Sequence, residues 1–312
     1  MGLLAAAGKL LPVALAFSGG VLFARRKIIQ ASDARVFNDF CFLFAIPSYL
    51  FAKIYTADLR HLFDWHALGS YMISVITGMA LLAVAVHLVS RPGPRGLALR
   101  LMAGVQVNTA YFAIPVFIML WGDATPIFPV LLMQTCLLTA TVIAIMEFDT
   151  GSEGSVPAKV SKAVWSSLNT PVVIACWAGI ALNLVDIPVP QAALDAFGFV
   201  GQAAAPIALF ALGLYLGGAG ISLRGTTREE IALVTIKCLV MPVAIYLLCR
   251  YAFDVRPPWL HYLTVLAAMP AAQNLFIVAQ RYEVETELAA SLVVKSSAAS
   301  LALLPLWIYL VA

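Results

Sequence analysis

Long apolar stretches alternate with short polar segments along the whole chain of 312 residues. About 20 apolar residues are enough for a helix to cross the hydrocarbon core of a bilayer. We predict ten such spans, at 10–24, 36–57, 67–89, 97–120, 126–147, 164–184, 193–216, 229–252, 259–280 and 286–311. The stretches lack the strict alternation typical of outer-membrane strands, so the pattern predicts an all-α membrane protein.

The composition supports the same class. Hydrophobic residues make up 62% of the chain and charged residues 11%, whereas a soluble domain carries roughly 25% charged residues. The net charge is +3 and no basic run is present, so we expect no nucleic-acid partner. The five cysteines lie inside predicted spans without paired spacing, which argues against a disulfide framework or a metal site.

The basic residues predict the orientation in the membrane. If the N-terminus is outside, the outer ends hold only Lys9, Arg60, Arg250 and Arg256. The inner loops then hold twelve basic residues: Arg25, Arg26, Lys27, Arg35, Arg91, Arg95, Arg100, Lys159, Lys162, Arg224, Arg228 and Arg281. The positive-inside rule then places both termini outside and the polar link 149–162 in the cytoplasm. A cluster of three basic residues follows the first span, which favours a first span over a cleaved signal peptide. We expect a multi-pass protein of a bacterial inner membrane.

The link 149–162 divides the ten spans into two sets of five, in residues 1–148 and 163–312. Because five is odd, the second set must enter the membrane from the opposite side. Two related sets would form an inverted repeat, an architecture that recurs in secondary transporters. Pro47 and Pro206 lie in corresponding spans, the second of each set.

Two motifs interrupt the fourth span of each set: "NTAYFAIP" (108–115) and "MPAAQN" (269–274). A proline breaks helix hydrogen bonding, and a break creates a helix N-terminus with free N–H groups. We predict that Pro115 lies in the first turn of one half-helix and that Asn274 caps the other. Two such ends near the midplane, with Asn108 adding hydrogen bonds, would bind an anion. The alternative is that the prolines only kink their helices.

These residues also carry a resemblance to a known family. The chain resembles the auxin efflux carriers, whose bacterial members include malonate-type and other organic-acid carriers. The matching stretches are "AAPIALFALGLYLGG" (204–218), "IKCLVMP" (236–242), "AAMPAAQNLFIVAQRY" (267–282), "SSAASLALLP" (296–305) and, more loosely, "VFNDFCFLFAIP" (36–47) and "NTAYFAIP".

The resemblance implies ten helices in two inverted five-helix repeats, with broken fourth and ninth helices that cross at the site. It implies a scaffold of helices 1, 2, 6 and 7 that dimerises, and a mobile unit of helices 3–5 and 8–10. It implies an elevator-type movement of that unit. The related bile acid symporters share this layout and use sodium, so coupling to H⁺ or Na⁺ is an open expectation.

Lys295 lies near the middle of the last span. A charged group inside a membrane is costly unless paired or hydrated, so we treat it as a functional candidate. Because no carboxylate is evident at that depth, its ammonium would bind a substrate carboxylate or replace a coupling cation. The alternative is a structural pairing with a polar group of the second or fourth span.

Other polar residues inside the spans complete the candidate site. Asp39 would carry a proton or pair with Arg35 one turn earlier. Gln134 would join Asn108 at the site or make a structural hydrogen bond between helices. The predicted substrate-binding residues are Asn108, Thr109, Pro115, Gln134, Pro270, Gln273, Asn274 and Lys295. The predicted ion-coupling residues are Asp39, Lys295, Ser296 and Ser297, where the serines would line the site or permit close packing.

Three functions compete. The first is a secondary transporter of a small organic anion, such as a mono- or dicarboxylate or an auxin-like acid. The second is a membrane sensor or scaffold that keeps the transporter fold. The third is an intramembrane enzyme, which needs paired acids, a metal cluster or an activated nucleophile, and the sequence offers none of these. We therefore expect no catalytic residues, no bound metal and no cofactor.

Overall fold

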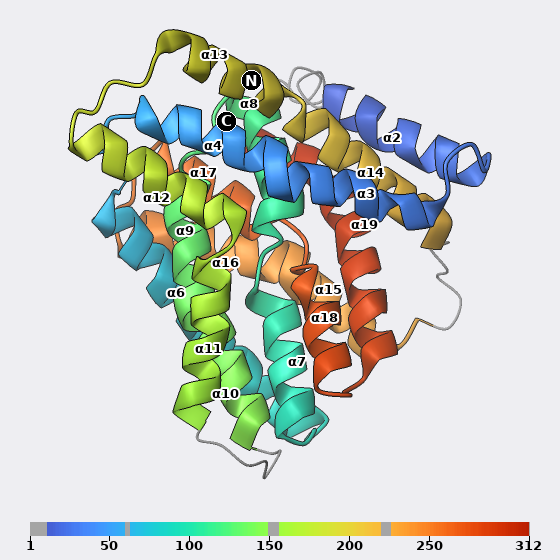
Figure 1. The fold of residues 1–312 in the computed structure, drawn as a ribbon. Helices are drawn as coiled ribbons and strands as arrows, with labels where there is room; N and C mark the ends of the chain where they lie inside the picture. The colour runs from blue at the N-terminus through green and yellow to red at the C-terminus, as the bar shows by residue number, and fades with distance from the viewer. Residues whose placement is uncertain (1–10, 60–62, 149–155, 220–225, 312) are drawn as a thin grey trace.

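The computed structural model describes residues 11–59, 63–148, 156–219 and 226–311. In these ranges the chain is all helical apart from turns and one isolated bridge, which confirms the all-α prediction (Figure 1). Six helices there have the length and apolarity to cross a membrane, and three shorter apolar helices accompany them. Ten spans stay a prediction.

The helices of the first half mostly follow the predicted spans. They are α2 (Leu11–Arg25), η1 (Ala31–Asp33), α3 (Ala34–Phe40), η2 (Cys41–Ala45), α4 (Ile46–Tyr55), α6 (Trp65–Val89), α7 (Pro94–Val105), η3 (Thr109–Ala113), α8 (Ile114–Trp121), α9 (Ile127–Met133), η4 (Gln134–Thr139) and α10 (Ala140–Phe148). Elements η2, η3 and η4 are π-helical turns.

The second half is built in the same way. Its helices are α11 (Val156–Leu168), α12 (Pro171–Leu184), α13 (Gln191–Gln202), α14 (Ala204–Ala219), α15 (Arg228–Thr235), η5 (Ile236–Val240), α16 (Met241–Leu247), η6 (Leu248–Ala252), α17 (Trp259–Ala267), α18 (Asn274–Arg281) and α19 (Thr286–Val311).

The sixth predicted span, 164–184, is not one helix. Helix α11 ends at Leu168 and α12 begins at Pro171, with Asn169 and Thr170 between them. Proline suits the first turn of a helix but not its interior, so Pro171 starts a new helix. The described part of the predicted link 149–162 is also helical from Val156 on, and residues 149–155 lie outside the described ranges.

The helices pack in two groups. Helices α2, α3, α4, α13 and α14 form the upper layer of Figure 1, in which α2 lies along α14, and α12 belongs to the same group because it packs against α4. Gly20 and Gly213 permit this contact, because a Cβ on Gly213 would lie 2.1 Å from the Phe17 carbonyl and one on Gly20 would lie 2.1 Å from that of Phe210. Small residues at such contacts let helix backbones approach closely in apolar surroundings.

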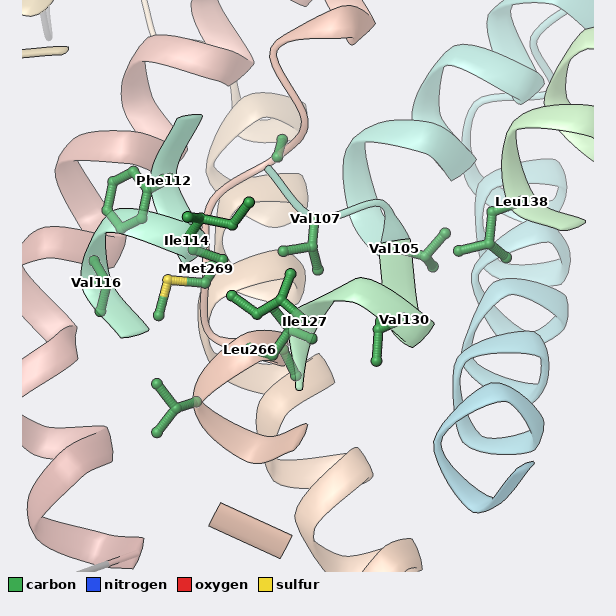
Figure 2. Close-up of a cluster of buried hydrophobic side chains, with 14 of the residues drawn as sticks. Val105, Val107, Phe112, Ile114, Val116, Ile127, Val130, Leu138, Leu266 and Met269 are labelled. Carbon is green, nitrogen blue, oxygen red and sulfur yellow. The ribbon is translucent and has the colours of Figure 1, made fainter. Parts of the chain in front are cut away.

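The second group contains α6, α7, α10 and the helices from α15 to α19. Its centre is the region where α7 and α17 end, and apolar side chains from several elements fill it (Figure 2). They include Val105, Val107, Ile127, Leu266 and Met269, all of them buried. This packing holds both chain interruptions described below.

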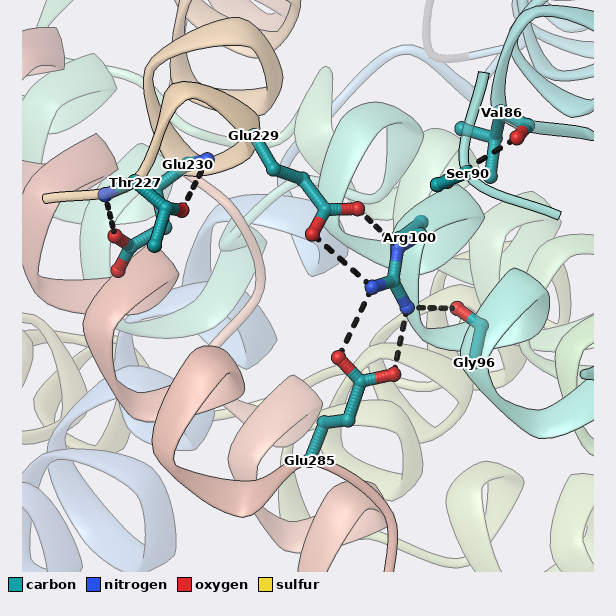
Figure 3. Close-up of polar contacts among 8 residues, drawn as sticks. All are labelled: Val86, Ser90, Gly96, Arg100, Thr227, Glu229, Glu230 and Glu285. Carbon is teal, nitrogen blue, oxygen red and sulfur yellow. Dashed lines mark hydrogen bonds and ion pairs between the residues drawn. The ribbon is translucent and has the colours of Figure 1, made fainter. Parts of the chain in front are cut away.

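A buried arginine ties three parts of the second group together. Figure 3 shows Arg100 of α7 between Glu229 of α15 and Glu285, which precedes α19. Its Nη1 lies 2.7 Å from Glu285 Oε1, and its Nε bonds Glu229 Oε1. Two carboxylates satisfy the guanidinium's donors in a nearly dry position, which makes the buried charge tolerable.

Candidate functional site

Two non-helical segments meet at the centre of the molecule. Residues 106–108 separate α7 from η3, and residues 268–273 separate α17 from α18. The segments run antiparallel where Val107 bridges Ala271, and the Asn108 N–H donates to the Pro270 carbonyl at 3.0 Å. Backbone groups that leave a helix in apolar surroundings need such partners.

Side-chain amides stabilise the first segment. Gln134 Oε1 accepts the Val107 N–H at 2.9 Å, and Gln106 Nε2 donates to Thr139 Oγ1 at 2.7 Å. Asn108 Oδ1 accepts the Tyr111 N–H at 3.2 Å and caps η3. All of these contacts come from neutral groups.

Hydroxyls and one ammonium stabilise the second segment. Ser296 Oγ accepts the Ala271 N–H at 3.1 Å, and Ser300 donates to the Ala268 carbonyl at 2.7 Å. Lys237, only 1% exposed, donates through Nζ to the Ala267 carbonyl at 2.8 Å. Ala267 ends α17, and a positive charge is favourable at a helix C-terminus.

A cavity of about 680 Å³ lies beside the crossing. Its walls include the two non-helical segments 106–108 and 268–273 and the elements η1 and α3. The α9–η4 region, the start of α12, and parts of α14, α18 and α19 complete them. Six side-chain amides line it: Asn38, Gln106, Asn108, Gln134, Gln273 and Asn274. The charged residues among the described lining are Arg35 and Asp39. The cavity therefore offers many hydrogen-bond donors and little net charge.

Several residues selected from the sequence meet at this cavity. Asn108, Thr109, Gln134, Gln273 and Asn274 all line it. Asp39 also lines it and lies 3.7 Å from Arg35, so the pairing alternative describes the observed geometry.

The two predicted helix starts have different outcomes. Buried Pro115 lies in the first turn of α8 as predicted, but a π-helical turn, η3, precedes α8, so the half-helix as a whole begins at Thr109 with Asn108 as its cap. Pro115 is absent from the described cavity lining. Asn274 is the first residue of α18 and exposed, and the capping position belongs to Gln273, which makes no side-chain cap bond.

Lys295 has a carboxylate partner that we did not anticipate. Its Nζ lies 3.0 Å from Glu230 Oε1, and both side chains are largely buried, at 14% and 7% exposure. Ser291 also bonds this carboxylate. Lys295 is absent from the described cavity lining. The sequence alone does not single out Glu230, because it lies at the start of a predicted span and 65 positions from Lys295.

The two candidate serines have different surroundings. Ser296 is occupied by the Ala271 N–H and by the Val293 carbonyl, so it supports the crossing. Ser297 donates to the Val293 carbonyl at 2.7 Å and lines a small recess beside Asn38 and Asn108. Pro270 contributes its carbonyl to the crossing.

The described residues hold no cluster of three potential metal-ligating side chains.

A series of polar contacts joins the ends of α10 and α18 to α11. Tyr282 donates to Glu147 at 2.7 Å, and Glu147 pairs with Lys159 of α11 at 2.9 Å. Burial and the adjacent carboxylate raise the pKa of Tyr282 to about 12, so its hydroxyl remains a donor at neutral pH. The ion pair between Glu147 and Lys159 holds α11 against α10.

Sequence reasoning missed Gln106, Thr139 and the role of Lys237. Gln106 lies two residues before Asn108, so its distance from the motif was a usable signal. Lys237 lies inside the stretch "IKCLVMP", and the structure buries it against α17. The position of Lys237 within its own helix does not reveal that α17 ends beside it, at Ala267.

Comparison with known proteins agrees with the motifs. Residues 5–308 match the family described as "Membrane transport protein", which confirms the resemblance to the auxin efflux carriers. The chain is 26% identical to the "Uncharacterized transporter YfdV" of Escherichia coli (strain K12) over 97% of this chain and 96% of the relative.

Two other relatives add detail. The "Putative malonate transporter" of Rhizobium meliloti (strain 1021) is 28% identical over 67% of this chain and 65% of its own. An "Uncharacterized transporter" of Methanothermobacter thermautotrophicus is 25% identical over 90% of both chains.

Proposed function

Because the chain belongs to the membrane transport protein family, we propose that it is a secondary carrier of a small organic anion, in particular a mono- or dicarboxylate. The main support for this proposal is the amide-lined cavity of about 680 Å³ beside the crossing of residues 106–108 and 268–273. Helix N-termini and amide N–H groups are suitable donors for a carboxylate. The name of the Rhizobium relative supports the same substrate class.

The substrate carboxylate is proposed to bind where the two half-helices η3 and α18 begin. Asn108 uses its Oδ1 for capping, which leaves its Nδ2 for a ligand. Gln273 and Asn274 line the same cavity from the other segment. In this proposal Lys295 is structural, because its charge is matched by Glu230.

An inverted repeat of two five-helix sets is proposed to underlie the crossing. In each set the helix after the crossing supplies the acceptor for a backbone N–H: Gln134 serves Val107, 27 residues away, and Ser296 serves Ala271, 25 residues away. Such equivalence is expected of duplicated halves. Ten membrane-crossing segments, four of them interrupted or shorter than a full span, follow from it.

An elevator-type movement is proposed between the two packing groups. The scaffold comprises predicted spans 1, 2, 6 and 7, and the transport unit comprises spans 3–5 and 8–10. Dimerisation through the scaffold belongs to the same proposal. The cavity lies between the groups, with walls from α3 and α14 on one side and α18 and α19 on the other, as relative movement requires.

The charge distribution supports an inward-facing state in a bacterial inner membrane. Arg35 and Asp39 lie at the end of the second span that the positive-inside rule places in the cytoplasm. Toward the opposite end, Tyr49 donates to the Gly122 carbonyl at 3.0 Å, and Trp121 packs on Tyr262. A reporter fused within 149–162 is expected to be cytoplasmic, and one after Ala312 outside. An outside signal from the link contradicts the orientation and the repeat.

Uptake into proteoliposomes tests the function. Purified protein is reconstituted and offered radiolabelled mono- and dicarboxylates, with and without sodium and a pH gradient. We expect saturable uptake of at least one carboxylate, and the ion dependence identifies coupling to H⁺, Na⁺ or neither. If no organic anion is taken up while the protein remains folded, the sensor or scaffold function replaces this proposal.

A further inference from the structure

Two buried side chains at the cavity have unused hydrogen-bonding atoms. Gln106 and Gln134 both line the cavity, and each is only 4% exposed. Gln106 Oε1 and Gln134 Nε2 have no hydrogen-bond partner in the structure. Buried polar atoms are nearly always paired, so two unpaired atoms beside one cavity call for a ligand that pairs with them.

The two atoms are chemically complementary. Gln134 Oε1 accepts the Val107 N–H, so Gln134 Nε2 is a spare donor. Gln106 Nε2 donates to Thr139, so Gln106 Oε1 is a spare acceptor. Gln134 bonds the N–H of Val107, the residue after Gln106, and Thr139 belongs to the same π-helical turn, η4, as Gln134. Together they can receive a group that carries a hydrogen-bond donor next to an acceptor.

The charge of the cavity limits what that group is. Its described charged residues, Arg35 and Asp39, have opposite signs and lie 3.7 Å apart, while its titratable residues are Tyr111, Tyr215 and Asp39. One carboxylate has neutral donors at Asn108, Gln273 and Asn274. A second carboxylate anion would lack a cation and would face the acceptor Gln106 Oε1. Burying an unmatched charge is costly, so the second group is neutral.

We propose that the carrier binds the singly charged form of a dicarboxylic acid, with its ionised end at the crossing and its neutral carboxyl group between Gln106 and Gln134. The carboxyl O–H donates to Gln106 Oε1, and the carboxyl C=O accepts from Gln134 Nε2. This inference rests on the proposed function and narrows its substrate. Because both atoms are sealed from solvent here, the contact requires a local adjustment of the cavity wall when the ligand enters.

Three probes separate the chemical possibilities: malonate, its half-amide malonamate and its monomethyl ester. The half-amide is a monoanion at every working pH and presents a donor and an acceptor. The half-ester is also a monoanion, but it presents an acceptor only. Competition against a transported labelled carboxylate in proteoliposomes gives the affinity of each probe.

We expect the apparent dissociation constant of malonate to rise about tenfold per pH unit above its second pKa, because only the protonated fraction binds. That of the half-amide should stay constant over the same range. The half-ester should bind at least about tenfold more weakly than the half-amide, since Gln106 Oε1 stays unpaired. If a group of the protein titrated instead, the apparent dissociation constants of all three probes would change together with pH.

Gln134→Glu tests the assignment within the protein. It keeps an oxygen for the Val107 N–H and replaces the spare donor by a carboxylate oxygen. We expect the half-amide to lose at least about tenfold in affinity. Gln280→Glu is the matched control on the exposed face of α18, outside the described cavity lining, and should change affinity less than twofold.

The outcomes distinguish this inference from the function on which it rests. If no carboxylate competes or is taken up, the proposed function fails. If carboxylates are transported but the half-amide and half-ester bind equally, or malonate binding follows its dianion, the inference is wrong and the two amide atoms serve a buried water. The three probes on the parent protein decide this even if Gln134→Glu does not fold.

Discussion

The two non-helical segments at the centre of the molecule solve the same problem with different chemistry. In each, a side chain from a later helix accepts a backbone N–H, Gln134 of η4 for Val107 and Ser296 of α19 for Ala271. Beyond that shared contact, the first segment is served by neutral amides, whereas the second receives the buried ammonium of Lys237.

The shared contact reflects a physical requirement, because a backbone N–H that leaves a helix in apolar surroundings must find an acceptor. The remaining contacts, neutral amides at one segment and an ammonium at the other, are not fixed by this requirement and differ between the two halves. The first segment keeps unpaired amide atoms beside the cavity, and the second places its charge on α17, away from the described cavity lining. Both segments line the cavity, but only the first keeps unpaired amide atoms there and only the second is bonded by a buried ammonium.

The largest effect is expected from Lys237→Met, which removes the charge and keeps an apolar stem. The Ala267 carbonyl loses its donor, and hydrogen bonds to charged groups contribute about 1.5–3 kcal/mol. We expect a lower unfolding midpoint in detergent and reduced uptake. Lys53→Met, on an exposed residue near the end of α4, is the control. A variant more stable than the parent would mean that desolvation of the ammonium outweighs its contact.

The next effect is expected at the shared contacts. Gln134→Leu and Ser296→Ala each leave a buried N–H unpaired, at a cost of about 1–3 kcal/mol. Because Val107 and Ala271 are bridged, the double variant should be less destabilised than the sum of the single ones. Thermal unfolding of the four proteins measures this coupling. Strict additivity would show that the segments act independently.

Alanine substitutions of the asparagines at the two segments should differ in their effect on the stability of the protein. Asn108→Ala removes a helix cap and is expected to cost about 1 kcal/mol, while Asn274→Ala removes no cap bond and should cost close to nothing. Both variants should lose uptake, because both residues line the cavity. Wild-type uptake by both folded variants contradicts the crossing as the binding site.

The smallest effect on substrate affinity is expected from Lys295→Met. The ammonium is matched by Glu230 and lies outside the described cavity lining, so affinity should change less than twofold. Binding measurements with and without sodium and at two pH values check this. A tenfold loss of affinity would restore Lys295 to the binding site, and a new ion dependence would assign it the role of a coupling cation.

The membrane class and the family were accessible from the sequence, because apolar run lengths and the stretches around Pro206 and Pro270 are local signals. Asn108 and Gln134 were accessible as polar residues in apolar stretches. The partners of charged residues were not. Glu230 and Lys295 lie 65 positions apart and meet only through helix packing. The start of the first half-helix at Thr109 was not predicted, because the π-helical turn η3 leaves no clear sequence signal.

The close contact of α2 and α14 has a consequence for biogenesis. Gly20 and Gly213 bring the two backbones together with no room for a side chain between them. Helix α2 leaves the ribosome well before α14, because nearly 180 residues separate the end of α2 at Arg25 from the start of α14 at Ala204. Helix α2 must therefore remain in the bilayer without its main partner while most of the first half is synthesised. Final assembly of the upper layer then occurs late, and a chain truncated before Gly213 cannot complete it.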